Sequence, residues 1–287
     1  MVNPRKTDKL NRVFKDTRDY SIFNKRANFL DILCTKKESV TVRNIAVITD
    51  IHGNYSALKA VLSDIERENQ VEHIFCLGDI IAIGHETNQV LEELRSRKDV
   101  SYVLGNHDEA ILNILNGEEP GSQGEERDHH YWIAKNMNRD FITFLSEMPK
   151  RLECMINGKK VLFLHYHLNE CDQFLSIDTN PSVTKLDDLY KNEDVDIICF
   201  GHHHILHNFK GNNSIYLNPG SLGCNSRPIA TYATISIKDD GCVDCNVKEV
   251  AYNNREFLIN YFRYDVPAKN TLLRIFHGNQ DSNIINE

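Results

Sequence analysis

The stretch Asn-Ile-Ala-Val-Ile-Thr-Asp-Ile-His-Gly-Asn, residues 44–54, places an apolar run directly before a cluster of polar side chains. Residues 45–49 predict a buried strand, because short apolar and β-branched runs that end at Asp or Gly are typical of such strands. Open α/β sheets bind their ligands at the carboxyl ends of strands. Residues 44–54 therefore predict an α/β fold with a candidate site that includes Asp50 and His52.

Four further apolar runs of the chain end in the same way. They cover residues 74–77, 102–104, 161–164 and 197–200. The polar side chains that follow these runs are Asp79, Asn106, His107, Asp108, His165, His202, His203 and His204. Because the carboxyl ends of neighbouring strands meet at one edge of a sheet, we expect these side chains to converge. The exception is His203, which should face elsewhere because side chains alternate along a strand.

Apolar residues at helical spacing predict helices between these strands. The first helix is indicated by Leu58, Val61, Leu62 and Ile65, with Ser56 as its N-cap. Residues 90–94 indicate a second helix, and residues 133–148 indicate a longer one that stops at Pro149. The remaining expected elements are an exposed loop at residues 116–128, short strands at residues 214–217, 232–237 and 243–250, and a closing helical region.

The donor atoms of the polar clusters are nitrogen and oxygen. In a strand or its extended continuation, residues i and i+2 point the same way, so Asp50 and His52 can address one point. The same spacing relates His202 and His204. Two neighbouring ions need a shared anionic ligand, and Asp79 suits this role as a carboxylate at a strand end. Without thiolates, the set favours manganese, iron, zinc, nickel or cobalt over copper(I) or an iron–sulfur cluster.

Length and charge narrow the class of protein. A chain of 287 residues can bury a large core, and a single α/β domain of this size is common. The net charge is −8, but residues 1–43 carry 11 Lys and Arg against 5 Asp and Glu, which leaves −14 on the remainder. An acidic body repels phosphate backbones, so a long nucleic acid is not expected as a partner.

The eight cysteines are scattered along the chain and do not predict a disulfide framework. Cys76 and Cys199 lie inside apolar runs, where a thiol packs like a small hydrophobic group. The C-x-x-C pair Cys242 and Cys245 has no second pair to complete a zinc site and is interpreted as incidental. No apolar run approaches the length of a membrane span. These features predict a soluble protein without membrane contact, located in the reducing cytoplasm.

The basic segment at residues 1–43 differs from the rest of the chain. Its apolar residues indicate one or two short helices before the first strand. One interpretation is an extension that docks on the body or stays partly disordered. The alternative is an arm through which homo-oligomers form, because the charge of the arm is opposite to that of the body.

The order of the five polar clusters resembles that of the calcineurin-like metallophosphoesterases. The resemblance covers residues 44–270 and rests on D-x-H-G-N, G-D, G-N-H-D, a lone histidine and G-H-x-H. Residues 78–84 and 218–223, with Arg227 and Tyr232 downstream, resemble the compact bacterial and archaeal phosphodiesterase branch. The resemblance implies an α/β fold, a four-layer αββα sandwich of two mixed sheets flanked by helices, with a metal site at the carboxyl ends of the strands.

The resemblance also implies a division of the chain and its cofactors. A metallophosphoesterase domain at residues 44–270 would follow the basic extension at residues 1–43 and precede a tail at residues 271–287. Two divalent metal ions are implied, with manganese preferred and iron, zinc, nickel and cobalt as alternatives. One ion would be held by Asp50, His52, Asp79 and His204, and the other by Asp79, Asn106, His165 and His202.

The implied reaction is attack on phosphorus by a water that the ions activate. His107 would act as an acid or stabilise the charge on the leaving group, and Asp108 would orient the ring of His107. Arg227 is a candidate clamp for a phosphate oxygen, since a guanidinium matches that geometry. His130 is a further candidate for contact with the substrate.

The expected function is hydrolysis of small phosphodiesters, nucleotides among them, together with some phosphomonoesters. Activity of the Ser/Thr protein phosphatase kind is one alternative. It lacks support because Ile-Ile-Ala-Ile-Gly follows Asp79, where those enzymes carry an arginine that grips phosphate. The other alternative is a non-catalytic scaffold similar to a retromer subunit. Loss of metal ligands would favour the scaffold, and no ligand of the pattern is lost here.

Overall fold

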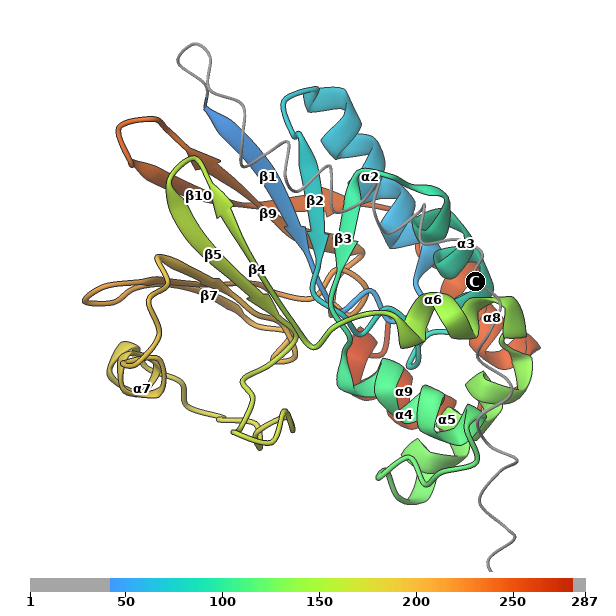
Figure 1. The fold of residues 1–287 in the computed structure, drawn as a ribbon. Helices are drawn as coiled ribbons and strands as arrows, with labels where there is room; N and C mark the ends of the chain where they lie inside the picture. Colours follow the sequence, from blue (N-terminus) through green and yellow to red (C-terminus); the bar gives the residue numbers. More distant parts are fainter. Residues whose placement is uncertain (1–41, 281–287) are drawn as a thin grey trace, which may run out of the picture.

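The computed structural model describes residues 42–280, whose strands form two five-stranded sheets of order β10-β9-β1-β2-β3 and β4-β5-β6-β8-β7 (Figure 1). The first sheet contains β1 (Arg43–Ile48), β2 (His73–Cys76), β3 (Val100–Tyr102), β9 (Ile229–Ile237) and β10 (Val243–Ala251). The second contains β4 (Arg151–Ile156), β5 (Lys159–Leu164), β6 (Ile197–Cys199), β7 (Leu206–Lys210) and β8 (Ile215–Pro219). Each sheet combines parallel and antiparallel pairs, so both are mixed, as expected.

The parallel strands bring the polar clusters together at one end of the two sheets. In the first sheet β1, β2 and β3 run parallel, and in the second β5, β6 and β8 do so. A backbone hydrogen bond joins the two sets of strand ends, because the N–H of Leu222, after β8, donates to the carbonyl of Thr49, after β1, at 3.0 Å. The loops after both sets of strands therefore form one region.

The two sheets pack face to face through a core of alternating strand residues. Ile45 and Val47 point from β1 into this core, while their neighbours Ala46 and Ile48 point to the opposite face. At the centre, the rings of Phe75 and Phe163 stack across the sheets at 3.8 Å between centroids. Burial of these apolar side chains is the main force that holds one sheet on the other.

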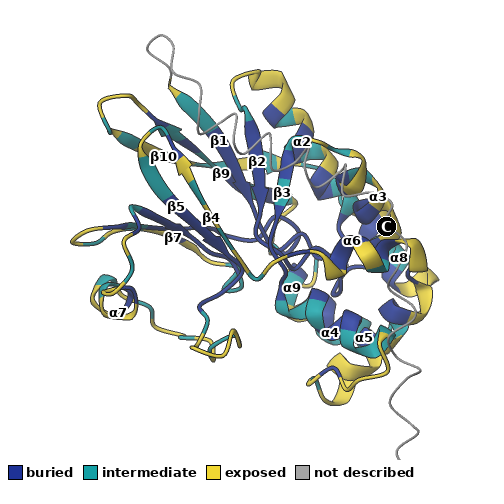
Figure 2. Cartoon of the chain, in the orientation of Figure 1, coloured by how far each residue is buried: buried dark blue, intermediate teal, exposed yellow. Residues whose placement is uncertain are grey.

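Helices cover the outer faces of both sheets and complete the four expected layers (Figures 1 and 2). α2 (Tyr55–Glu68) and α3 (Thr87–Ser96) pack on the first sheet, and α7 (Val183–Leu189) packs on the second. The other helices are α4 (Asn106–Leu115), α5 (Gly124–Asn136), the 3-10 helix η1 (Arg139–Phe141), α6 (Ile142–Ser146), α8 (Arg255–Arg263) and α9 (Lys269–His277). No helix among residues 42–280 has the length and apolar character needed to cross a membrane.

Two helix boundaries differ from the sequence-based expectation. α2 is capped by Asn54 rather than Ser56, because the Asn54 side chain accepts from the N–H of Ala57 at 3.0 Å. The long helix expected at residues 133–148 is wrong as a single element. α5 begins at Gly124, inside the loop expected at residues 116–128, and ends at Asn136, and η1 and α6 follow it. The backbone turns extended at Met137, and the Asn138 side chain then caps η1.

One helix crosses the boundary expected at the carboxyl end of the domain. α9 continues across the boundary expected between residues 270 and 271, and it buries Leu272 and Leu273 against the body. The first 41 residues of the basic extension, with the helices and the oligomer arm expected there, lie outside the described residues. The free thiols among the described residues include Cys76, Cys171, Cys199, Cys224, Cys242 and Cys245.

Three buried histidines outside the strand-end clusters predict that the fold weakens in acid. Burial lowers the pKa of His129, His167 and His277 to about 3, whereas a histidine in the unfolded chain has a pKa near 6.5. The unfolded state therefore binds more protons as the pH falls below about 6.5, and stability is lost from there down to about pH 3. Each histidine can contribute a loss of up to about 1.4 kcal/mol per pH unit.

Urea unfolding of chelator-treated protein between pH 7 and pH 5 measures how steeply the free energy of unfolding changes with pH. His277 is a good test position, because its Nε2 lies 3.0 Å from the hydroxyl of Tyr261 within a fully buried contact. In His277→Gln the free energy of unfolding should fall less steeply with decreasing pH, because the unfolded state takes up about one proton fewer. This holds even if the variant is less stable at every pH. An unchanged slope would show that His277 is not held neutral by the fold.

Candidate metal centre

The seven expected donor residues lie together at the carboxyl ends of the parallel strands. Asp50, His52, Asp79 and His165 are almost completely buried, and the side chain of His204 is 20% exposed. Asp50, His52, Asp79 and Asn106 follow strands of the first sheet, whereas His165, His202 and His204 follow strands of the second. Both sheets therefore contribute to one site.

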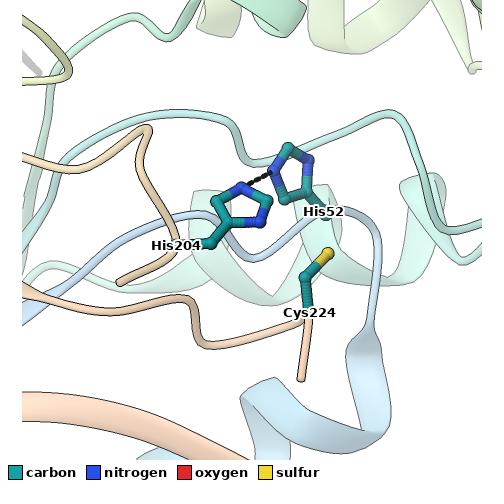
Figure 3. Close-up of side chains that lie close together, drawn as sticks. All are labelled: His52, His204 and Cys224. Atoms are coloured by element: carbon teal, nitrogen blue, oxygen red, sulfur yellow. Dashed lines mark hydrogen bonds between the residues drawn. The ribbon is translucent and has the colours of Figure 1, made fainter. Parts of the chain in front are cut away.

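The first half of the centre is built around two imidazoles. The Nε2 atoms of His52 and His204 lie 2.9 Å apart (Figure 3). Nε2 of His204 is 3.3 Å from a carboxylate oxygen of Asp50, and Nε2 of His52 is 3.7 Å from one of Asp79. His52 therefore lies close to potential ligand atoms of Asp79 and His204, and His204 lies close to one of Asp50.

The second half shares Asp79 with the first. Nε2 of His165 lies 3.2 Å from Oδ2 of Asp79 and 2.9 Å from Oδ1 of Asn106. Donor atoms of Asp79, His165 and His202 all lie within 4.8 Å of one another. A single oxygen, Oδ2 of Asp79, is therefore close to both histidine groups.

Hydrogen bonds fix how these side chains are presented. Nδ1 of His165 lies 2.8 Å from the carbonyl of Leu77. Since a carbonyl only accepts, this contact requires a proton on Nδ1 and directs Nε2 into the centre, where it can bind an ion once its own proton is lost. The Asp50 carboxylate accepts from the hydroxyl of Thr49 at 2.7 Å and from the N–H of His202 at 3.0 Å.

The backbone at most of the donors is left-handed rather than extended. The φ angles are 54° at Asp50, 48° at His52, 48° at Asp79, 69° at His202 and 55° at His204. The extended course expected for both His-containing pairs is therefore wrong, although Nε2 of His52 still lies 3.7 Å from a carboxylate oxygen of Asp50. Left-handed conformations of residues other than glycine carry strain of about 1–3 kcal/mol each and cluster at functional sites. The convergence is a property that the surrounding fold enforces.

Gly105 allows the loop before α4 to approach Asp79 closely. A Cβ atom at this position would lie 2.1 Å from the backbone nitrogen of Asp79 and 2.2 Å from its Oδ1. The same approach lets the N–H of His107 donate to Oδ1 of Asp79 at 2.9 Å. Oδ1 is thereby occupied by the backbone, which leaves Oδ2 for the centre.

The electrostatics of the centre fit a bound cation. Burial disfavours charge on Asp79, but the imidazoles of His165 and His107 outweigh it and hold the pKa of Asp79 well below its usual range. Burial likewise disfavours charge on His165, but the carboxylates of Asp79 and Asp50 outweigh it and raise the pKa of His165 to about 9. The buried carboxylates thus favour positive charge between them. Carboxylate, imidazole and amide donors are suited to a divalent ion in that position.

The partner of His107 is another histidine and not Asp108. Nδ1 of His107 lies 2.8 Å from Nε2 of His130, whose Nδ1 lies 2.8 Å from the hydroxyl of Ser122. The Asp108 carboxylate instead accepts from the backbone N–H groups at the start of α4 and after β2, namely those of Gly105, Ile80 and Ile81. The expectation that Asp108 orients the His107 ring is therefore wrong, because the carboxylate is used to cap α4.

Two hollows lie beside the donor residues. One, of about 300 Å³, is lined by His204, Arg227 and the loop at residues 225–227. Arg227 is 65% exposed and lies 3.3 Å from a carboxylate oxygen of Glu249. The other hollow, of about 270 Å³, is lined by Asn106, His130 and residues 120–122. Arg227 and His130, the two expected substrate contacts, therefore line two different hollows, one next to His204 and the other next to Asn106.

Sequence reasoning missed two residues next to the first half of the centre. The sulfur of Cys224 lies within 4.8 Å of donor nitrogens of His52 and His204 (Figure 3). The ring of Phe276, on α9, lies 5.7 Å from that of His204 and 6.4 Å from that of His52. Cys224 directly follows the motif at residues 218–223, which was the available signal, whereas nothing in the sequence relates Phe276 to the distant histidines.

Comparisons with known proteins agree with this architecture. A family model described as "Calcineurin-like phosphoesterase superfamily domain" matches residues 44–240. Uncharacterized protein MJ0912 of Methanocaldococcus jannaschii is 34% identical over 202 residues, which are 62% of this chain and 76% of that protein. The symmetrical bis(5'-nucleosyl)-tetraphosphatase of Sodalis glossinidius is 35% identical over 104 residues, but these are only 36% of this chain and 32% of that protein. The crystal structure of hypothetical protein PH1004 from Pyrococcus horikoshii OT3 has the same fold, with a TM-score of 0.69 at 16% identity over 82% of this chain and 97% of that one.

Proposed function

Because the chain belongs to the calcineurin-like phosphoesterase superfamily, we propose that it hydrolyses small phosphodiesters, nucleotides among them, with the help of two divalent metal ions. The observation that carries this proposal is the position of Asp79. Its Oδ2 lies 3.7 Å from Nε2 of His52 and 3.2 Å from Nε2 of His165. A carboxylate between two sets of nitrogen and oxygen donors suits a pair of ions. The preference for manganese belongs to the same proposal.

The proposed division of the residues between two ions follows the family resemblance, and the contacts of Asp79 with His52 and His165 support it. Asp50, His52, Asp79 and His204 would hold one ion, and Asp79, Asn106, His165 and His202 would hold the other. When bound, a pair of such ions supplies a water acidic enough to act as a nucleophile and neutralises charge that develops on the phosphate. The protein contributes by fixing the donors in advance, through the strained loops and hydrogen bonds described above.

His107 is proposed to donate through its ring to the departing oxygen, as an acid or by stabilising the charge on that oxygen. Burial lowers the pKa of His107 well below its usual value, so the ring is neutral and carries one proton. If the Ser122 hydroxyl donates to Nδ1 of His130, then Nε2–H of His130 donates to Nδ1 of His107. The remaining proton of His107 is then on Nε2, the atom that is free to donate. This chain of hydrogen bonds replaces the role expected for Asp108.

Two separate hollows next to donor residues, one at His204 and one at Asn106, support a substrate that carries two substituents on its phosphate. Arg227 could hold a phosphate oxygen, since its exposed pair with Glu249 is weak and easily exchanged. The volumes of the two hollows, about 300 and about 270 Å³, favour small substituents rather than a folded protein as substrate. The match to a bis(5'-nucleosyl)-tetraphosphatase supports nucleotides as the substituents, within the third of the chain that it covers.

A panel of substrates tests the proposal. Protein loaded with manganese, and separately with zinc or cobalt, should hydrolyse bis(p-nitrophenyl) phosphate and at least one of the cyclic nucleotides or dinucleoside polyphosphates. Phosphopeptides serve as the comparison and should react more slowly. Protein that binds two ions and hydrolyses none of these compounds, nor p-nitrophenyl phosphate, would instead be a binding scaffold.

A further inference from the structure

Cys224 belongs to a loop that is held against the first half of the centre. Its N–H donates to the hydroxyl of Ser221 at 2.9 Å, and that hydroxyl donates to the carbonyl of Asp50 at 2.8 Å. The N–H of Gly223 also donates to the Asp50 carbonyl, at 3.0 Å. A Cβ at residue 223 would lie 1.9 Å from the carbonyl oxygen of Ile51, so only glycine permits this approach. The position of Cys224 relative to Asp50 and His52 is thus fixed by the backbone.

The thiol points toward the two imidazoles that begin this half of the centre. Cys224 is 5% exposed, and its sulfur and one nitrogen each of His52 and His204 all lie within 4.8 Å of one another. In Figure 3 the sulfur is directed toward the rings of the histidine pair. No other cysteine among the described residues lies in a group with two histidines at this spacing.

Two imidazoles and one thiol make a donor set with its own metal preference. Zinc binds cysteine sulfur at about 2.3 Å and histidine nitrogen at about 2.0–2.1 Å, so the three atoms need only small shifts to share one ion. Sulfur donors favour zinc, cobalt or iron over manganese, which prefers oxygen. The alternative role for Cys224 is simple packing, since its side chain also contacts the cluster that contains Ile83 and Phe257.

We propose that Cys224 is a sulfur ligand of the ion held by His52 and His204. This inference rests on the proposed metal centre and makes its two halves unequal. The first half offers nitrogen, oxygen and sulfur, while the second offers only nitrogen and oxygen. As the sulfur–metal bond forms, the thiol releases its proton to solvent. The first half then takes a zinc, cobalt or ferrous ion, and manganese is left to the second half.

Cobalt(II) provides a direct readout of sulfur coordination. The metal-free protein is titrated with cobalt under reducing, oxygen-free conditions, and the bound ions are counted by elemental analysis. The wild-type protein should develop a sulfur-to-cobalt charge-transfer band in the ultraviolet. Cys224→Ser should lose this band. Cys171→Ser, which alters an exposed free thiol, is the matched control and should retain it.

The outcomes separate this inference from the proposed function. A protein that binds cobalt and hydrolyses phosphodiesters without the band, or a band that persists in Cys224→Ser, would show that Cys224 only packs, and would leave the metal centre intact. Failure of the folded wild-type protein to bind cobalt, zinc or manganese would refute the centre and the sulfur ligand together. Circular dichroism of Cys224→Ser checks that loss of the band does not reflect loss of the fold.

Discussion

Replacement of Asp79 with Ala should abolish phosphodiester hydrolysis and greatly reduce the amount of bound metal. Its Oδ2 lies close to both His52 and His165, so its removal weakens both proposed ion positions at once. A pair of ions contributes several kcal/mol of stabilisation to the transition state, and a loss of that size lowers the rate by more than about 10³-fold. Turnover of bis(p-nitrophenyl) phosphate and elemental analysis of the dialysed protein measure the two effects.

Asp188→Ala provides the control for this experiment. Asp188 is an exposed carboxylate on α7 that pairs with Lys191. This variant should keep wild-type activity and metal content. Unfolding of Asp79→Ala in the presence of a chelator should be cooperative, which shows that the fold survives without the carboxylate. An Asp79→Ala protein that still binds two ions per chain and hydrolyses the diester would contradict the shared role of Asp79.

Replacement of His107 with Ala should lower turnover by about 10²- to 10⁴-fold, the usual effect of removing a proton-transfer group. Metal content should stay near normal, because His107 contributes its backbone N–H, and not its ring, to the contact with Asp79. The loss should depend on the leaving group. A p-nitrophenolate leaves without a proton, so the defect with p-nitrophenyl esters should be much smaller than the defect with alkyl or nucleoside esters.

The dependence on the leaving group distinguishes proton transfer from a structural effect of the same substitution. An equal loss with all leaving groups would indicate that His107 holds the shape of the site rather than donates a proton. Normal turnover of nucleoside esters would remove His107 from the mechanism. His130→Asn, which changes only the partner of His107, should give a smaller loss with the same order of leaving groups.

The layered fold could be predicted from sequence because its central strands are strongly marked. β1, β2, β5 and β6 are nearly continuous apolar runs, as expected for strands with both faces buried. β4 and β7 escaped prediction because charged or polar residues such as Arg151 and Asn208 interrupt their pattern at the sheet edges. α4 is not predicted because its first residues belong to the polar cluster that contains Asn106.

Local alternatives account for the errors at the helix ends. Asn54 and Ser56 are both good caps, and the choice depends on the Asn54 amide, which also donates to the carbonyl of Gly223 at 2.9 Å. Residue 223 is far from residue 54 in the sequence, so no local pattern predicts that Asn54 rather than Ser56 caps the helix. The break after Met137 likewise depends on a tertiary contact, because the N–H of Asn138 donates to the side chain of Asn88 at 2.8 Å.

The donor residues of the candidate centre were recognisable because they recur at strand ends, but their geometry was not. The left-handed backbone of Asp50 and His202 is maintained by hydrogen bonds between loops of different sheets, which a linear pattern does not encode. The contact between Cys224 and His52 could not be predicted from the sequence for the same reason. Its sulfur reaches His52 only because the loop after β8 bonds to the loop after β1.

The division of the donors between the sheets has a consequence for the mechanics of the molecule. Asp79 follows a strand of one sheet and His165 follows a strand of the other, so an ion between them would fasten the two halves of the protein at their shared end. Opening the interface would then require release of the ion as well as exposure of the apolar core. At a free-ion concentration one hundred times the dissociation constant, this coupling adds about 2.7 kcal/mol of resistance to unfolding.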